Sequence, residues 1–249
     1  MCELLWDHTI HYINDLQQAN AVFEKNGLIA KQGGSHEGFG TCNSLSYFWA
    51  SYVEFLSIDD KIVNKNPVED ILIFADAGKF LPKHEAFGRI GLRTHDIVAL
   101  RNKLVKKNLS LSEIFAGNRT TPDGERLTWK LLMINGDYGG LSYPFIIDWE
   151  ITEEQRFRQL KGKGLINQHP LGQLFLYEGV FAVENPEITA KHWADIFGFA
   201  QKNETTLIIG QQLFRFEKGS ENRLQELNFL CDGEKGFDFK IGEGRYRSL

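Results

Sequence analysis

The stretch DLQQANAVFEKNGL, residues 15–28, recurs without a gap as DIVALRNKLVKKNL, residues 96–109. Both stretches begin with an aspartate and carry apolar residues at the spacing of one helix face. An aspartate is a favoured N-cap, because its carboxylate accepts hydrogen bonds from the first backbone N–H groups of a helix. The sequence therefore predicts two equivalent helices and an internal repeat.

The elements around these two helices follow one order. Strand-forming residues precede each helix, at 4–13 and at 87–94. After the first helix we expect a short strand at 28–31, a glycine-rich loop GGSHEGFGT at 33–41, and an antiparallel pair at 43–49 and 52–58. After the second helix the closing strands are expected at 127–134 and 143–149. Each repeat is thus a βαβββ module.

A third, fainter module follows the first two. Its elements are expected as a strand at 173–183, a helix at 188–197 and strands at 206–209, 212–217 and 224–230. We predict an α+β protein with modules at about 4–58 and 87–150, paired within residues 1–150, and an inserted helix at about 67–80. A polar linker at 151–172 and the third module at 173–249 complete the predicted organisation.

Composition excludes several classes of function. The 28 Lys and Arg against 33 Asp and Glu give a net charge of −5, which disfavours nucleic acid and anionic membrane surfaces as partners. The three cysteines form no CxxC motif, so a reducing, cytoplasmic location without disulfides or zinc thiolates is expected. No long apolar run predicts a membrane span. No glycine-rich phosphate-binding motif occurs, so no nucleotide cofactor is expected.

Five segments carry a family resemblance: DHTIHYINDL (7–16), GGSHEGFGTCNSL (33–45), YVEFLSI (52–58), NRTTPDGERLTW (118–129) and PFIIDW (144–149). Together they resemble the glyoxalase-like family of the vicinal oxygen chelate superfamily, whose fold is shared by glyoxalases, bleomycin-resistance proteins and extradiol dioxygenases. The resemblance implies that paired βαβββ modules form a cleft, usually with a divalent metal. In that superfamily a His of the first strand and a Glu of the fourth strand are often metal ligands.

His8 and Glu54 occupy these two positions. Strand alternation places His8 on one face with Ile10 and Tyr12, and groups Glu54 with Tyr52. A neutral imidazole and a carboxylate are suitable ligands for Fe, Mn, Ni or Zn. The alternative is a buried His–Glu hydrogen bond without metal.

The second module differs at the corresponding positions, where Arg89 replaces His8 and the best match for Glu54 is Asp148. An arginine is always cationic and cannot ligate a metal. Arg89 could pair with Asp148, or it could hold a carboxylate or phosphate of a substrate.

Further candidates lie in the matched segments. His36 could be a third metal ligand, a general base, a substrate contact or an exposed turn residue. Thr41 and Asn43 could bind a ligand carbonyl or only the loop backbone. Arg119 and Trp129 flank a predicted turn and could serve as an anion clamp and an aromatic wall.

The leading hypothesis is a glyoxalase-like lyase, isomerase or dioxygenase acting on an oxygen-rich small molecule in the cleft between the modules. If Arg89 or Arg119 holds the substrate, that molecule is anionic. The expected catalytic residues of this enzyme are His36 and Glu54, its metal ligands His8 and Glu54, and its substrate contacts Arg89, Arg119, Thr41, Asn43, Trp129 and Asp148. The rival hypothesis is a metal-free small-molecule binding protein. An odd number of modules also favours a homodimer, because one sheet would lack an internal partner.

Overall fold

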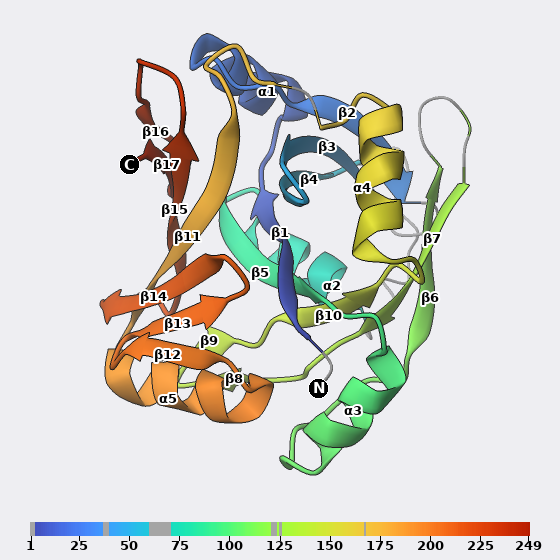
Figure 1. Ribbon diagram of the computed structural model, residues 1–249, viewed down its shortest axis with the longest axis vertical. Coiled ribbons are helices and arrows are strands. Elements are labelled where there is room, and N and C mark those ends of the chain that lie inside the picture. The colour runs from blue at the N-terminus through green and yellow to red at the C-terminus, as the bar shows by residue number, and fades with distance from the viewer. Residues whose placement is uncertain (1–2, 37–39, 60–70, 121–123, 125, 167) are drawn as a thin grey trace.

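The computed structural model describes residues 3–36, 40–59, 71–120, 124, 126–166 and 168–249. Figure 1 shows the arrangement of its elements. The N-terminal elements are β1 (Leu5–Tyr12), α1 (Leu16–Lys25), β2 (Lys31–His36), β3 (Thr41–Phe48), β4 (Ser51–Ile58), α2 (Leu72–Phe80), β5 (Ala86–Arg93), α3 (Ile97–Val105), β6 (Phe115–Thr120), β7 (Arg126–Leu132), β8 (Asp137–Tyr138), β9 (Leu141–Ser142) and β10 (Phe145–Asp148). The C-terminal elements are α4 (Glu153–Gly162), β11 (Leu174–Val183), α5 (Pro186–Phe197), β12 (Ala200–Asn203), β13 (Thr206–Ile209), β14 (Gln212–Lys218), β15 (Arg223–Cys231), β16 (Asp238–Ile241) and β17 (Gly244–Ser248).

The strands of the first two modules close into a barrel. Their order is β1-β4-β3-β2-β6-β7-β10-β5. Within each module the first and last strands are parallel, β1 with β4 and β5 with β10. The modules meet through antiparallel pairing of β1 with β5 and through the pair Ser35 and Thr120 of β2 and β6. The predicted α+β fold of paired βαβββ modules is confirmed.

The repeated aspartates cap the first helix of each module. Asp15 accepts hydrogen bonds from the backbone N–H groups of Gln17 and Gln18, and Asp96 accepts one from Ala99. These bonds satisfy N–H groups that have no partner inside the helix. The inserted helix forms as α2, within the predicted range, of which residues 67–70 lie outside the described part of the chain.

Two local predictions were wrong. Residues 33–36 of the glycine-rich stretch expected as a loop belong to β2, which pairs with β3, whereas residues 37–39 of that stretch lie outside the described part of the chain. The stretch expected as a linker contains α4, whose N-terminus is a capping box of Thr152 and Gln155. Leu160 of α4 packs with the buried Tyr47 and Tyr52, so this segment belongs to the core.

The C-terminal sheet repeats the strand order of the barrel. Its order is β12-β13-β14-β11-β15-β17-β16. The strand β15 is antiparallel to β11 as β5 is to β1, and β17 is parallel to β15 as β10 is to β5. Among the described residues, no helix lies between β15 and β17. The third module is therefore followed by three strands arranged like part of a fourth module.

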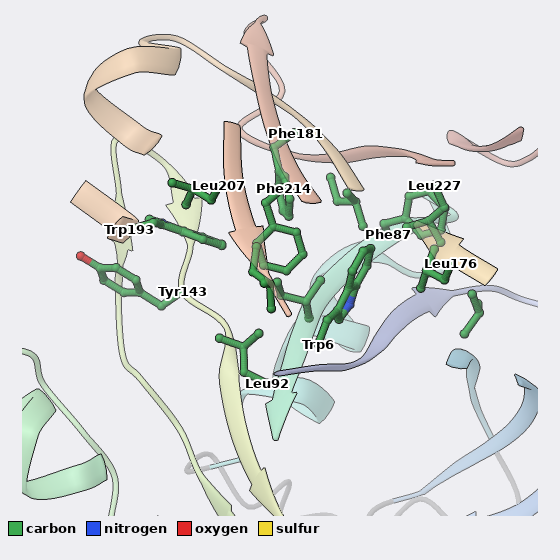
Figure 2. Packing of buried hydrophobic residues seen from close by; sticks show 14 of the residues in the cluster. Trp6, Phe87, Leu92, Tyr143, Leu176, Phe181, Trp193, Leu207, Phe214 and Leu227 are labelled. Carbon is green, nitrogen blue, oxygen red and sulfur yellow. The ribbon is translucent and has the colours of Figure 1, made fainter. Parts of the chain in front are cut away.

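A Phe-rich core joins the sheet to the outside of the barrel. Trp6 of β1 meets Phe214 of β14 edge to face, with ring centroids 4.9 Å apart (Figure 2). His11 of β1 hydrogen-bonds the hydroxyl of Tyr246 in β17 at 2.6 Å. The sheet thus covers the outer face of β1. The barrel interior is not part of this interface and contains a cavity of its own. In the described ranges, no helix combines the length and apolar character needed to cross a membrane.

Candidate active site

A small cavity of about 50 Å³ lies inside the barrel. Its polar lining consists of His8, His36, Asn43, Tyr52 and Glu54, and its remaining walls are apolar and largely aromatic. Ile73 and Phe74 of α2 contribute to these walls. The first module therefore supplies the polar groups, while α2 and the second module supply most of the apolar surface.

His8 is held by its neighbour in the sequence. Its Nδ1 lies 2.8 Å from Oδ2 of Asp7, and both side chains are buried. An ionised carboxylate can only accept hydrogen bonds, so Nδ1 of His8 donates to it, and in the neutral imidazole Nε2 is then the nitrogen with the free lone pair. Nε2 lies 3.5 Å from Oε2 of Glu54. The Asp7 contact thus directs Nε2 of His8 toward the carboxylate of Glu54.

Asp7 remains ionised because several groups stabilise its charge. Trp149 donates its indole N–H to Oδ1 of Asp7 at 3.1 Å. Burial by itself would raise the pKa of this carboxylate. The Arg156 charge, the hydrogen bond from His8 and the Arg93 charge outweigh burial and lower the pKa from its ordinary 3.8 to about 2. Arg156 comes from α4 and lies 3.9 Å over the ring of Trp149.

Glu54 lies at the centre of the polar cluster and is 8% exposed. Its Oε1 accepts a hydrogen bond from Nδ2 of Asn43 at 2.5 Å. The same oxygen is 3.8 Å from Nε2 of His36. Two imidazoles therefore face the two oxygens of one carboxylate.

His36 reaches the cavity because the glycine-rich segment is a strand. Its Nδ1 lies 3.0 Å from the hydroxyl oxygen of Thr41, its partner across the β2–β3 ladder. Its ring contacts Phe74 of α2 at 5.3 Å. Thr41 thus lies behind His36 and positions it, whereas Asn43 faces the cavity itself.

Aromatic rings and a glycine fix the plane of His8. Its ring stacks on Tyr52 at 4.5 Å and meets the edge of Phe145 at 5.1 Å. A Cβ atom at Gly91 would lie 2.8 Å from Cε1 of His8 and 2.9 Å from Cζ of Phe145. The absence of a side chain at Gly91 lets the imidazole approach the backbone of β5.

The predicted pair of Arg89 and Asp148 does not form. Nε of Arg89 donates to Oδ2 of Asp76 at 2.7 Å, and Asp76 belongs to α2. Asp148 accepts hydrogen bonds from the backbone N–H groups of Ile97 and Glu150. Both side chains lie outside the cavity lining and are used to hold α2 and the start of α3.

Two predicted substrate contacts remain, Trp129 and Arg119. Trp129 lines the cavity, and its ring lies 5.3 Å from that of Trp149. Arg119 lies in β6, opposite Leu127, but its side chain is outside the described part of the structure.

Strand register identifies the counterparts of His8 and Glu54 in the other units. In the first module Glu54 pairs with Ile10, two residues after His8. The equivalent strand pairs in the other units are Gly91 with Phe145, Val180 with Arg215 and Asn228 with Arg247. Phe145, not Asp148, therefore corresponds to Glu54 in the second module. In the third module Glu178 takes the position of His8 and forms an ion pair with Arg215 at 3.1 Å. Of these register positions, only those of the first module hold a histidine facing a carboxylate.

The site's donor atoms are of the types that bind Fe, Mn, Ni or Zn. In the part of the chain that the structure describes, however, no three His, Cys, Asp or Glu side chains form a group able to hold a metal ion. The arrangement as it stands does not fit a metal, and we derive no chemical step through one.

Sequence reasoning missed Asp7, Tyr52, Phe74 and Trp149 as parts of the site. Asp7 was expected on the opposite face from His8, but a register shift between Trp6 and His8 brings the two side chains together. The PFIIDW segment contained Trp149, yet an aromatic residue after a strand is more often core. Phe74 could not be placed because α2 is an insertion.

Comparison with known proteins agrees with this geometry. The family described as "Glyoxalase-like domain" matches residues 6–197. The chain belongs to this family. A comparison with curated proteins finds no match.

Solved structures share the fold of this family member. A hypothetical protein from Staphylococcus aureus is 24% identical over 99% of both chains, with a TM-score of 0.84. A mutant 4-hydroxymandelate synthase from Streptomyces coelicolor is 10% identical over 93% of this chain and 72% of its own, with a TM-score of 0.55. Methylmalonyl-CoA epimerase from the same organism is 13% identical over 59% of this chain and 98% of its own, with a TM-score of 0.44. The first two of these structures share the fold of this chain over most of its length.

Proposed function

We propose that this protein is a glyoxalase-type isomerase or lyase that transfers protons on a small, oxygen-rich molecule inside the barrel. The observation that carries the proposal is the line Asp7–His8–Glu54. A buried, ionised aspartate fixes the tautomer of His8, whose bare Nε2 faces the carboxylate of Glu54 at 3.5 Å. Such paired bases, largely buried, are suited to removing a proton next to a carbonyl group.

Glu54 is the proposed base. Its carboxylate takes a proton from the carbon beside the substrate carbonyl, and the electron pair of that C–H bond moves toward the carbonyl oxygen. His36 is the proposed proton donor to this oxygen, with Thr41 donating to Nδ1 so that the ring proton lies on Nε2. Glu54 then returns its proton to the former carbonyl carbon, while the hydroxyl group of the deprotonated carbon becomes the new carbonyl and gives its proton back to His36, which completes the isomerisation of an α-hydroxy carbonyl compound.

His8 supports Glu54 in this scheme. After Glu54 has taken the proton, the lone pair on Nε2 of His8 can share it. The negative charge of Asp7 further favours the protonated form of the His8–Glu54 pair. The Asn43 amide holds the other oxygen of Glu54 in place. These contacts keep the carboxylate aimed at the cavity.

Substrate entry requires movement of α2 side chains. The cavity of about 50 Å³ has room for a few water molecules, far below the roughly 300–1,000 Å³ of ordinary ligand sites. Phe74 and Ile73 form the wall on the α2 side. Their displacement would create room for a compound of a few carbon atoms.

The test is a turnover screen with matched variants. Purified protein is incubated with α-oxoaldehydes, α-hydroxy ketones and catechols, as isolated and after addition of Fe, Mn, Ni or Zn. Turnover by the wild type that falls at least about 100-fold in Glu54→Gln and His8→Ala supports the proposal. Arg215→Ala is the control, because Arg215 occupies the position of Glu54 in the third module.

Three outcomes would contradict or revise the proposal. Binding of panel compounds without turnover favours the rival hypothesis of a metal-free binding protein. Turnover of catechols only after metal addition favours the predicted dioxygenase and the predicted ligands His8 and Glu54. Turnover that is retained in Glu54→Gln excludes this site.

The predicted cytoplasmic location and homodimer also remain proposals. The argument for a dimer rested on an unpaired third module, whereas β11 of that module pairs with β15 of the same chain. Sedimentation at micromolar concentration tests the dimer directly.

A further inference from the structure

A second cavity, of about 480 Å³, lies outside the barrel. It is bounded by α4, by the turn between β3 and β4, and by the ends of β11 and β15. Its volume falls within the usual range of small-molecule sites and is far larger than that of the barrel cavity. Its lining shares no residue with the barrel cavity.

Trp49 stands at this cavity in an unfavourable backbone conformation. Its φ is 66°, a region in which bulky residues are outliers and glycine or asparagine is favoured. The side chain is nevertheless 48% exposed rather than used in the core. A strained position with a large exposed aromatic side chain is typical of a functional site.

Aromatic and aliphatic side chains line much of the cavity. Trp49 contacts Phe157 of α4, with ring centroids 4.9 Å apart. Phe175 and Leu230 also line the cavity, and Leu230 is exposed. Flat, rigid apolar walls of this kind favour a planar ring, because stacking adds to burial of apolar area.

The lining of this cavity carries one lysine, Lys161, and one aspartate, Asp232. Asp232 already accepts a hydrogen bond from the backbone N–H of Gln173 at 2.7 Å. Lys161 lies on α4 at the same cavity and carries an exposed ammonium group. His169 on the floor is engaged through both ring nitrogens, with Ile29 N–H and the Tyr47 carbonyl. Lys161 is thus the cation placed to meet an anion.

We propose that this cavity binds a planar aromatic carboxylate, with the ring beside Trp49 and Phe157 and the carboxylate toward Lys161. The site is separate from the proposed catalytic one and does not depend on it.

The experiment titrates the full chain with 2-naphthoate and with its neutral analogue 2-naphthamide by calorimetry. We expect saturable binding of one 2-naphthoate per chain. Trp49→Gly should weaken this binding about tenfold or more, because the stacking wall is lost. The melting temperature of this variant should be equal to or above that of the wild type, because glycine suits the positive φ. Lys161→Gln should weaken 2-naphthoate about two- to fivefold and leave 2-naphthamide unchanged.

The matched control is Asn108→Gly. Asn108 is exposed, also has a positive φ of 60°, and lies after α3, outside the cavity lining. This variant should bind 2-naphthoate as the wild type does. Absence of saturable binding, unchanged binding in Trp49→Gly, or a marked loss of melting temperature in Trp49→Gly would overturn the proposal, the last because it would give Trp49 a structural role. A homodimer that buries Trp49 would overturn it as well.

Discussion

Oδ2 of Asp7 lies 2.8 Å from Nδ1 of His8, although consecutive residues of a regular strand point to opposite faces. The register of β1 against β5 shifts between Trp6 and His8, and this irregularity turns both side chains toward each other. A local distortion of one strand thus creates the carboxylate–imidazole contact on which the proposed chemistry rests.

Asp7→Asn should lower the stability of the protein at neutral pH and make its unfolding free energy less sensitive to acid. The folded pKa of Asp7, about 2, lies below its ordinary 3.8, so the carboxylate contributes about 2 kcal/mol of stability above pH 4. That contribution is lost as pH falls from 3.8 toward 2. Urea unfolding between pH 5 and pH 2.5 should show the two proteins converging in free energy of unfolding. A difference that stays constant over this range would contradict the assignment.

His11→Phe should reduce the fall in unfolding free energy that the wild type shows between pH 6 and pH 4. Burial lowers the pKa of His11 from 6.5 to about 3, so the unfolded chain takes up a proton that the folded chain does not. Wild-type stability should therefore fall by about 1.4 kcal/mol per pH unit from this residue between pH 6 and pH 4. The difference between wild type and variant measures this contribution, and the exposed His95→Gln is the control. Parallel curves would count against a neutral buried His11.

Gly91→Ala should displace His8. The added Cβ would lie 2.8 Å from the imidazole, which is already held between Tyr52 and Phe145. We expect a loss of about 1–3 kcal/mol in unfolding free energy. Gly78→Ala is the matched control, because nothing lies within 4 Å of a Cβ there and alanine favours the helix by up to about 1 kcal/mol. Equal effects of the two substitutions would show that His8 is not confined by Gly91.

Arg215→Ala should affect stability but not turnover. Glu178 would remain largely buried, with the amide of Asn228 still donating to its Oε2 at 2.9 Å but without its ion-pair partner Arg215. We expect the unfolding free energy to fall by about 1–2 kcal/mol, because the buried Glu178 carboxylate loses the hydrogen bonds and the charge of Arg215. Thermal unfolding and turnover, measured on one preparation, separate the two effects. Loss of turnover in a folded variant would show that the C-terminal sheet takes part in catalysis.

The repeated helices could be predicted because they depend on local pattern, and the facing of His8 and Glu54 was expected from the family resemblance together with strand alternation. Asp15 and Asp96 mark helix starts whatever the tertiary context, and strand alternation fixed the inward side of β1 and β4. The βαβββ order then followed from the repeat.

Other features depend on long-range contacts that local patterns do not contain. The glycines of β2 disfavour a strand, but pairing with β3 and β6 imposes one. The polar sequence of α4 concealed a helix whose inward residues are Arg156 and Leu160, although the Thr152–Gln155 capping box was a usable signal. The Arg89–Asp76 pair could not be foreseen without the position of α2.

The most direct test of the central claim is hydrogen exchange at carbon. A panel of α-oxoaldehydes and α-hydroxy ketones is incubated in D₂O with wild type and Glu54→Gln, and loss of the C–H signal beside the carbonyl is followed by NMR. The account predicts enzyme-dependent exchange with at least one compound and a fall of at least about 100-fold in Glu54→Gln at unchanged folding. Equal exchange rates in the two proteins, or no enzyme-dependent exchange with compounds that bind, would contradict it.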